Sequence, residues 1–173
     1  HLTVLSGAGL IRRTPSRGDG RRVYLRLEPH ALDLAVIPKL TASSLVFVCT
    51  HNSARSQIAA ALWNARSEIP AASAGTDPAP RVHPGAVAVA ARHGIRLAGR
   101  PLGYEALEQR PDLVVSVCDR AREGSWPFDG IRHLHWSVAD PTETGTDAAF
   151  DEAFDEIVAR IDAVVPSITK GTP

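Results

Sequence analysis

The sequence has few cysteines, no excess charge of either sign and no long apolar segment. Only Cys49 and Cys118 are present among 173 residues, too few for the disulfide framework of an exported protein. Basic and acidic residues number 19 each, so no overall charge favours binding to nucleic acid or to a membrane. No apolar run approaches the roughly 20 residues that span a bilayer, and no secretory signal is recognisable. We therefore expect a cytoplasmic protein without a membrane partner.

Methionine is absent, and lysine is nearly so. Only Lys39 and Lys170 of the 19 basic residues are lysines, which leaves 17 arginines. Together with abundant alanine, this composition is typical of a GC-rich genome. Because the chain lacks methionine and begins at His1, we expect it to be part of a longer protein.

Residues 1–36 form a basic segment that differs from the rest of the chain. The pattern predicts the end of a helix stopped by Gly9, then two short strands around a turn at residues 16–20. Six arginines against three acidic residues give this segment a net charge of +3. It resembles the recognition-helix end and the wing of arsenic-responsive winged-helix repressors, and we expect a partial winged-helix remnant; a plain solvated basic hairpin is the alternative. DNA binding is expected only if a complete winged-helix domain lies upstream.

Residues 37–43 are expected to be a linker, and from residue 44 onward strands alternate with helices. The run Leu45–Cys49 is continuously apolar, which is typical of a parallel strand covered on both faces. The pattern predicts an α/β fold with an open four-stranded parallel sheet and helices on both faces. Ligands of such sheets bind beyond the carboxyl ends of the strands, where Cys49 and Cys118 fall. The expected strands are 45–49, 71–75, 113–118 and 131–138, and the expected helices are 53–66, 84–94 and 147–165.

The segment after the first of these strands carries the clearest chemistry. Cys49 and Arg55 lie six positions apart and are joined by small polar residues at a strand-to-helix turn. The amides of such a loop and the following helix N-terminus can converge on a tetrahedral anion, and an arginine fork can bind two of its oxygens. The same positive field favours attack by Cys49 as thiolate. The expected anion-binding residues are Thr50, His51, Asn52, Ser53, Ala54, Arg55 and Ser56.

Several of these residues have competing interpretations. Cys49 could be a small buried hydrophobe at a strand end. Asn52 is expected to brace the loop, through a side-chain bond or a left-handed backbone, rather than to contact substrate. Ser56 could donate a hydrogen bond to the Cys49 thiolate or cap the helix. His133 and His135 would share one face of a strand, but no third ligand stands at a suitable spacing, so no metal is expected.

Residues 44–173 are expected to be one domain, and its motifs indicate a family. The cysteine–arginine loop and the late pair Asp140-Pro141 make residues 44–165 similar to the low-molecular-weight phosphotyrosine phosphatase fold, which includes the arsenate reductases. Phosphatases of this fold typically place a tryptophan after Ser-Ala-Gly and a tyrosine after Asp-Pro. This chain has neither, which favours a bare inorganic anion. The segments that resemble the reductase branch are His51-Asn52, Arg55-Ser56-Gln57, Ser73-Ala74-Gly75-Thr76, His83-Pro84-Gly85 and Gly94-Ile95.

The resemblance implies roles for two residues outside the loop. Asp140 would be the general acid that protonates the oxygen leaving when Cys49 attacks, although Asp-Pro is also a common turn starter. Cys118 would be either the resolving thiol, which releases arsenite and leaves a disulfide, or a buried structural thiol. In the second case a small external thiol such as mycothiol or glutathione would attack the adduct instead. Ala54 and Ser125 stand where thioredoxin-coupled reductases carry further cysteines, so the full relay is missing.

We therefore expect a thiol-dependent arsenate reductase with no bound cofactor and with arsenate in the Cys49–Ser56 loop. The external reductant would be mycothiol, glutathione with glutaredoxin, or thioredoxin. One alternative is a low-molecular-weight protein tyrosine phosphatase that acts through a phosphocysteine intermediate. The other is a regulatory module that senses arsenic species without turnover, which the N-terminal hairpin suggests.

Overall fold

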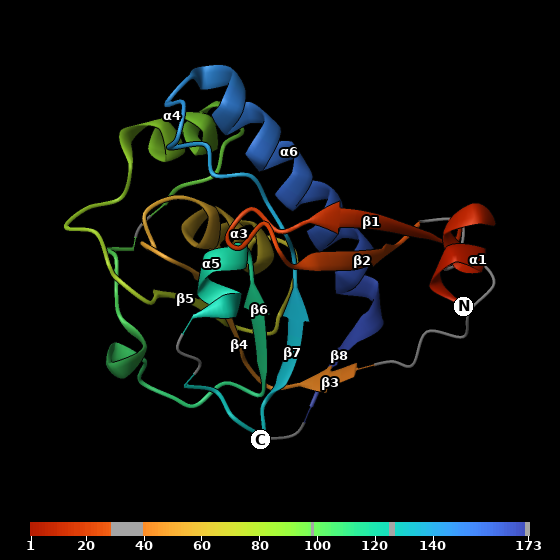
Figure 1. Ribbon diagram of the computed structural model, residues 1–173. Helices are drawn as coiled ribbons and strands as arrows, with labels where there is room; N and C mark the ends of the chain where they lie inside the picture. Colours follow the sequence, from red (N-terminus) through yellow and green to blue (C-terminus); the bar gives the residue numbers. More distant parts are fainter. Residues whose placement is uncertain (29–39, 98, 125–126, 172–173) are drawn as a thin grey trace.

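The computed structural model describes residues 1–28, 40–97, 99–124 and 127–171. Its centre is a parallel four-stranded sheet with the strand order β5-β4-β6-β7 (Figure 1). The expected α/β fold with an open four-stranded parallel sheet is confirmed. The four strands, in that order, are Ala71–Gly75, Leu45–Cys49, Leu113–Ser116 and Arg132–His135.

The register of the sheet decides where the candidate site lies. β4 is buried along its whole length and pairs with β5 on one side and β6 on the other. Cys49 stands opposite Gly75, and Val48 stands opposite Ser116. Because the strands are parallel, the carboxyl ends of β4 and β6 meet at one edge of the sheet. The loop after Cys49 and the segment that contains Cys118 are therefore neighbours.

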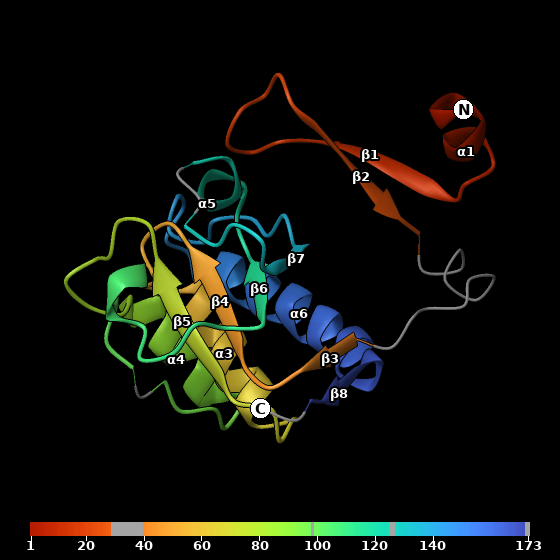
Figure 2. The ribbon, with the colours of Figure 1, turned by 90° about the horizontal axis from the view of Figure 1, so that it is seen from below.

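Helices cover the two faces of the sheet unequally. The helices α3 (Arg55–Asn64), α4 (Pro84–Arg92) and α6 (Asp147–Val164) lie on one side and bury the larger core with Phe47 and Trp63 (Figure 2). The other face has a smaller apolar cluster around Val48 and Phe128. The short 3₁₀ helix η1 (Tyr104–Ala106) packs against this cluster through Tyr104. The helix α5 (Asp119–Glu123) lies near the carboxyl ends of β4 and β6.

Part of the expected linker is regular structure. Residues Leu40–Ala42 form β3, which pairs in parallel with β8 (Ile168–Lys170) after the 3₁₀ helix η2 (Val165–Ser167). The reason is apolar burial, since Ala42 and Ile168 belong to the main core and Leu40 packs against it. Residues 37–39 of that expected linker lie outside the described residues.

The N-terminal segment has the expected helix end and hairpin. The helix α1 (Leu2–Gly7) is followed by Gly9, whose φ of +70° is the left-handed conformation that glycine adopts most readily. The strands β1 (Ile11–Pro15) and β2 (Val23–Leu27) pair antiparallel. The turn between them reaches α5, while α1 lies far from the sheet (Figures 1 and 2). None of the helices in the described ranges is long and apolar enough to cross a membrane.

Candidate active site

Cys49 ends β4, and its sulfur lies inside the loop that follows. The residue is 2% exposed. The backbone N–H of Asn52 donates to Cys49 Sγ at 3.2 Å, and Ser56 Oγ lies 3.0 Å from the same sulfur. Because Asn52 Nδ2 donates to Ser56 Oγ at 2.8 Å, the Ser56 hydroxyl hydrogen is free to point at the sulfur. The contact expected between Ser56 and Cys49 is therefore present.

Asn52 braces the loop by both of the expected means. Its φ is +47°, and it is the one non-glycine residue with positive φ among the described parts of the chain. Its side chain is completely buried. Asn52 Oδ1 accepts hydrogen bonds from Gln57 Nε2 at 3.1 Å and from the Leu102 backbone N–H at 2.9 Å. These bonds tie the loop to the start of α3 and to the segment that precedes η1.

The peptide groups of the loop are turned in one direction. The carbonyls of Thr50, His51 and Ser53 accept hydrogen bonds from the backbone N–H groups of Asp77, Ala79 and His83 at 2.9, 2.9 and 2.8 Å. In a planar trans peptide the next N–H points the opposite way from the carbonyl. The N–H groups of His51, Asn52 and Ala54 therefore point away from residues 77–83, and that of Asn52 donates to the Cys49 sulfur. Such a run of N–H groups is an anion-binding concavity.

The absence of a side chain at Gly75 leaves space for this loop. A Cβ at position 75 would lie 2.6 Å from the Thr50 carbonyl oxygen and 2.9 Å from the Asn52 backbone nitrogen. Both neighbours are backbone atoms of the loop, which cannot move aside without disturbing the N–H groups described above. Glycine is therefore required where β5 passes beneath the loop.

Arg55 begins α3 and joins the loop to the segment that carries Asp140. The residue is 7% exposed. Its Nη1 donates to the Val138 carbonyl at 3.0 Å, and its Nη2 forms an ion pair with Asp140 Oδ2. Asp140 Oδ1 accepts from the backbone N–H and the hydroxyl of Thr142, at 3.1 and 2.7 Å. The structure thus brings Arg55 and Asp140 together, with the guanidinium directed inward rather than toward solvent.

Cys118 lies beside the same loop. Its Sγ is 3.4 Å from Thr50 Oγ1 and accepts from the Ala121 backbone N–H at 3.4 Å, as the N-terminal cap of α5. The residue is 2% exposed, and this burial raises the pKa of the Cys118 thiol above its ordinary value. The positive charge of Arg55 opposes that shift, while the Cys49 sulfur adds to it. Each sulfur thus contacts the loop, Cys118 Sγ at the Thr50 hydroxyl and Cys49 Sγ at the Asn52 amide.

Tyr104 is a site neighbour that the sequence pattern did not indicate. Its hydroxyl is buried and finds no hydrogen-bond partner among the described residues. The ring packs edge-on against Phe128, with 5.0 Å between the ring centroids. Burial, and then the charges of Cys118 and Cys49, raise the pKa of Tyr104. A single tyrosine forms no sequence motif that would indicate a site. The β-bridge between Gly75 and Gly103 places the neighbouring Tyr104 at this end of β5.

Comparison with known proteins identifies the family. A sequence model described as low molecular weight phosphotyrosine protein phosphatase matches residues 44–172. The chain belongs to this family. A search of curated protein sequences gave no match.

Solved structures similar to this phosphatase-family chain include arsenate reductases and phosphatases. An arsenate reductase from Archaeoglobus fulgidus is 28% identical with a TM-score of 0.63, covering 70% of this chain and 98% of that one. The thioredoxin-dependent arsenate reductase of Corynebacterium glutamicum is 23% identical with a TM-score of 0.53, covering 79% of this chain and 65% of that one. The tyrosine phosphatase Wzb of Escherichia coli, in complex with sulphate, is 20% identical with a TM-score of 0.63, covering 73% and 98%. The last two likenesses, below 25% identity, support the fold alone.

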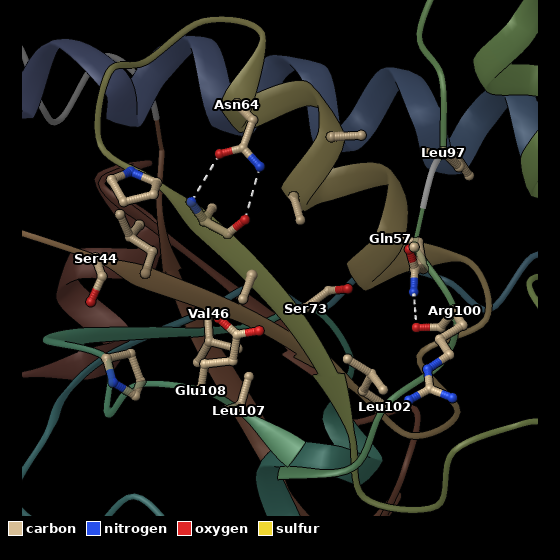
Figure 3. A pocket seen from close by; sticks show the side chains of 18 of the residues that line it. Ser44, Val46, Gln57, Asn64, Ser73, Leu97, Arg100, Leu102, Leu107 and Glu108 are labelled. Atoms are coloured by element: carbon tan, nitrogen blue, oxygen red, sulfur yellow. Dashed lines mark hydrogen bonds between the residues drawn. The ribbon is translucent and has the colours of Figure 1, made fainter. Parts of the chain in front are cut away.

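Two other features of this phosphatase-family domain lie outside the Cys49 loop. A cleft of about 860 Å³ lies between α3, β5 and residues of the segments 94–97 and 99–111 (Figure 3). It touches the loop only indirectly, because Gln57 Nε2 donates both to Asn52 Oδ1 and to the Arg100 carbonyl.

The described residues contain no group of three His, Cys, Asp or Glu side chains able to hold a metal. His133 and His135 instead share the Ser116 hydroxyl, at 2.8 and 2.7 Å.

Proposed function

We propose that this protein is a thiol-dependent arsenate reductase. The observation that carries the proposal is the place of Cys118, a second free thiol whose sulfur contacts Thr50 of the anion loop at 3.4 Å. A phosphatase of this family needs one thiol, because water hydrolyses its cysteinyl intermediate. A reductase needs a second thiol to attack the cysteinyl adduct, and Cys118 is the only other cysteine of the chain.

Arsenate would lie over Cys49, inside the loop formed by residues 50–56. The N–H groups of His51, Asn52 and Ala54 would bind its oxygens, as their orientation allows. Arg55 would supply the fixed positive charge, since its guanidinium is already held inward by Asp140.

The first chemical step would form a cysteinyl–arsenate adduct. The Cys49 thiolate attacks arsenic, so an S–As bond forms and an As–O bond breaks. Asp140 would donate a proton to the departing oxygen, which leaves as water. The ion pair sets Asp140 beside the guanidinium that would bind arsenate. Because an ion-paired carboxyl group is ionised, Asp140 must take up a proton before it can donate one.

The second step would reduce arsenic. The Cys118 thiolate attacks Cys49 Sγ, so an S–S bond forms and the electron pair of the S–As bond stays on arsenic. Arsenic gains two electrons and leaves as arsenite, while the two thiols are oxidised to a disulfide. The field of Arg55 and the Thr50 contact favour the Cys118 thiolate against the effect of burial. An external thiol system (mycothiol, glutathione with glutaredoxin, or thioredoxin) would then reduce the disulfide.

The alternative is a protein tyrosine phosphatase, which the matched family description favours. Its first step would use Cys49, Arg55 and Asp140 in the same way, and water would then release phosphate. The chain places Asp77-Pro78 after the Ser-Ala-Gly strand and Thr142 after Asp140-Pro141. These residues provide no aromatic wall for a phosphotyrosine ring, so we place the phosphatase second.

The deciding experiment measures arsenite formation from arsenate with each candidate reductant, for the wild type and for Cys49→Ser and Cys118→Ser. We expect turnover that Cys49→Ser abolishes and that Cys118→Ser lowers at least tenfold. Unchanged turnover in Cys118→Ser with a small thiol would remove Cys118 from the mechanism. Aryl phosphate hydrolysis without any thiol, and no arsenite, would make the protein a phosphatase. Binding of inorganic phosphate with neither activity would leave a sensing role.

A further inference from the structure

The turn of the N-terminal hairpin is bonded to both ends of α5. Ser16 Oγ and Tyr24 Oη both donate to Glu123 Oε1, at 2.7 and 2.8 Å. The backbone N–H of Arg17 donates to Asp119 Oδ2 at 2.6 Å. These contacts join residues about 100 positions apart in sequence, and in both views the turn lies over α5 (Figures 1 and 2).

The turn is shaped to fit α5 closely. Ser16 is 7% exposed, although most of the hairpin is exposed. Its Oγ accepts the backbone N–H groups of Gly18 and Asp19 at 2.9 and 3.0 Å, which leaves the hydroxyl hydrogen for Glu123. A Cβ on Gly18 would lie 2.8 Å from Glu123 Oε2 and 3.2 Å from the Arg120 backbone nitrogen. The hairpin backbone therefore packs directly against the helix.

The hairpin also completes the surroundings of a buried carboxylate. Asp119 is 3% exposed, and its oxygens contact His135 Nε2 at 3.0 Å and Ser137 Oγ at 3.0 Å, besides the Arg17 amide. Tyr24 covers the same histidine, with 4.5 Å between the ring centroids. Burial alone would raise the pKa of Asp119, but the bonds from His135, Arg17 and Ser137 together lower it. The Arg17 amide is thus one of three donors that hold this negative charge.

The position of the Cys118 thiol depends on how α5 is held, because Cys118 is the N-terminal cap of that helix. A helix of five residues has too few internal hydrogen bonds to hold its own place, so contacts with other elements fix it. We propose that the β1–β2 hairpin is a positioning element of the site, which fixes α5 through Glu123 and Asp119 and so holds Cys118 beside the Cys49 loop. The consequence of this positioning for arsenate reduction rests on the proposed reductase function. The claim that the hairpin holds α5 and Cys118 in place does not.

The test compares variants of the two hydroxyl donors with a matched control on the same hairpin. Ser16→Ala combined with Tyr24→Phe removes both bonds to Glu123 and keeps the aromatic ring on His135. Arg12→Ala removes the Arg12–Glu28 ion pair (2.6 Å), which lies away from α5. The measurement is the rate of iodoacetamide alkylation of each cysteine in the full chain, resolved by mass spectrometry. Alkylation of a buried thiol reports how often its surroundings open.

We expect Cys118 to react about tenfold faster in the double variant, since two bonds to a charged acceptor are lost. Cys49 should react within about twofold of wild type, and Arg12→Ala should leave both rates within about twofold. An unchanged Cys118 rate in the double variant would overturn the proposal. So would a parallel rise at Cys49, which would indicate general loosening. If the double variant does not fold, Tyr24→Phe alone should raise the Cys118 rate about threefold, and Ser16→Thr, which keeps a hydroxyl, should not.

A second measurement separates this proposal from the reductase proposal. Anaerobic arsenate without external thiol should form a Cys49–Cys118 disulfide in one turnover, and the double variant should form it several-fold more slowly. Absence of that disulfide in the wild type would refute the reductase function and leave the alkylation result to judge the hairpin. A disulfide formed equally fast in both proteins would overturn the chemical consequence of the positioning role.

Discussion

Asn52 offers the most direct test of how the anion loop is held. Asn52→Ala removes three neutral hydrogen bonds, to Ser56 (2.8 Å), Gln57 (3.1 Å) and the Leu102 amide (2.9 Å). At about 1 kcal/mol for each bond, and about 1 kcal/mol for placing alanine at a left-handed φ, the free energy of unfolding should fall by about 4 kcal/mol. Asn52→Gly loses the same bonds without that strain and should be about 1 kcal/mol more stable than the alanine variant.

The matched control is Asn64→Ala. Asn64 is exposed and makes two side-chain hydrogen bonds, both to the backbone of Ala71 at 2.8 Å (Figure 3). Its loss should cost about 2 kcal/mol and leave the anion loop unchanged. Urea denaturation gives the free energies, and calorimetric titration with inorganic phosphate gives the affinity of the loop for an anion.

Phosphate should bind to Asn52→Ala at least about tenfold more weakly than to the wild type, because the inward N–H groups lose their support. Asn64→Ala should bind phosphate within about twofold of wild type. The reasoning is refuted if Asn52→Ala unfolds within about 1 kcal/mol of wild type. It is equally refuted if that variant keeps its phosphate affinity.

Three further predictions concern single residues. Gly75→Ala should destabilise by about 1–3 kcal/mol in urea denaturation and weaken phosphate binding, whereas Gly20→Ala, with no atom within 4 Å, should do neither. Tyr104→Phe should not lower the melting temperature, because no described residue accepts from its buried hydroxyl; a clear drop would show an unseen partner. The pKa of His133 is lowered from 6.5 to about 4, first by burial and then by Arg122. Between these two pH values the folded state binds fewer protons than the unfolded state. The free energy of unfolding should therefore decrease as the pH is lowered from 6.5 to about 4, and it should decrease less steeply in His133→Gln.

The sequence determined the parts of this protein that depend on neighbouring residues. The apolar run before Cys49 identified the central strand, and alternation along the chain identified the parallel sheet. The predicted helix at 53–66 begins only at Arg55, because the residues before it bend to form the anion loop. The spacing of Cys49 and Arg55 is itself local, so the order of residues along the chain is enough to locate the candidate loop. The family match to residues 44–172 agrees with that location.

Only the tertiary structure decided which distant residues meet at the loop. It paired Arg55 with Asp140, placed Cys118 beside Thr50, and turned residues 40–42 into a strand through contact with the C-terminal segment. It also brought the hydroxyl of Tyr104 into the field of both sulfurs and laid the hairpin on α5. The physical reason is that side-chain periodicity records which face of an element is buried, whereas hydrogen bonds between distant polar groups depend on the packing of whole elements. Polar residues such as Ser16 and Glu123 carry no pattern that links them, although 107 positions of chain separate the two ends of a 2.7 Å bond.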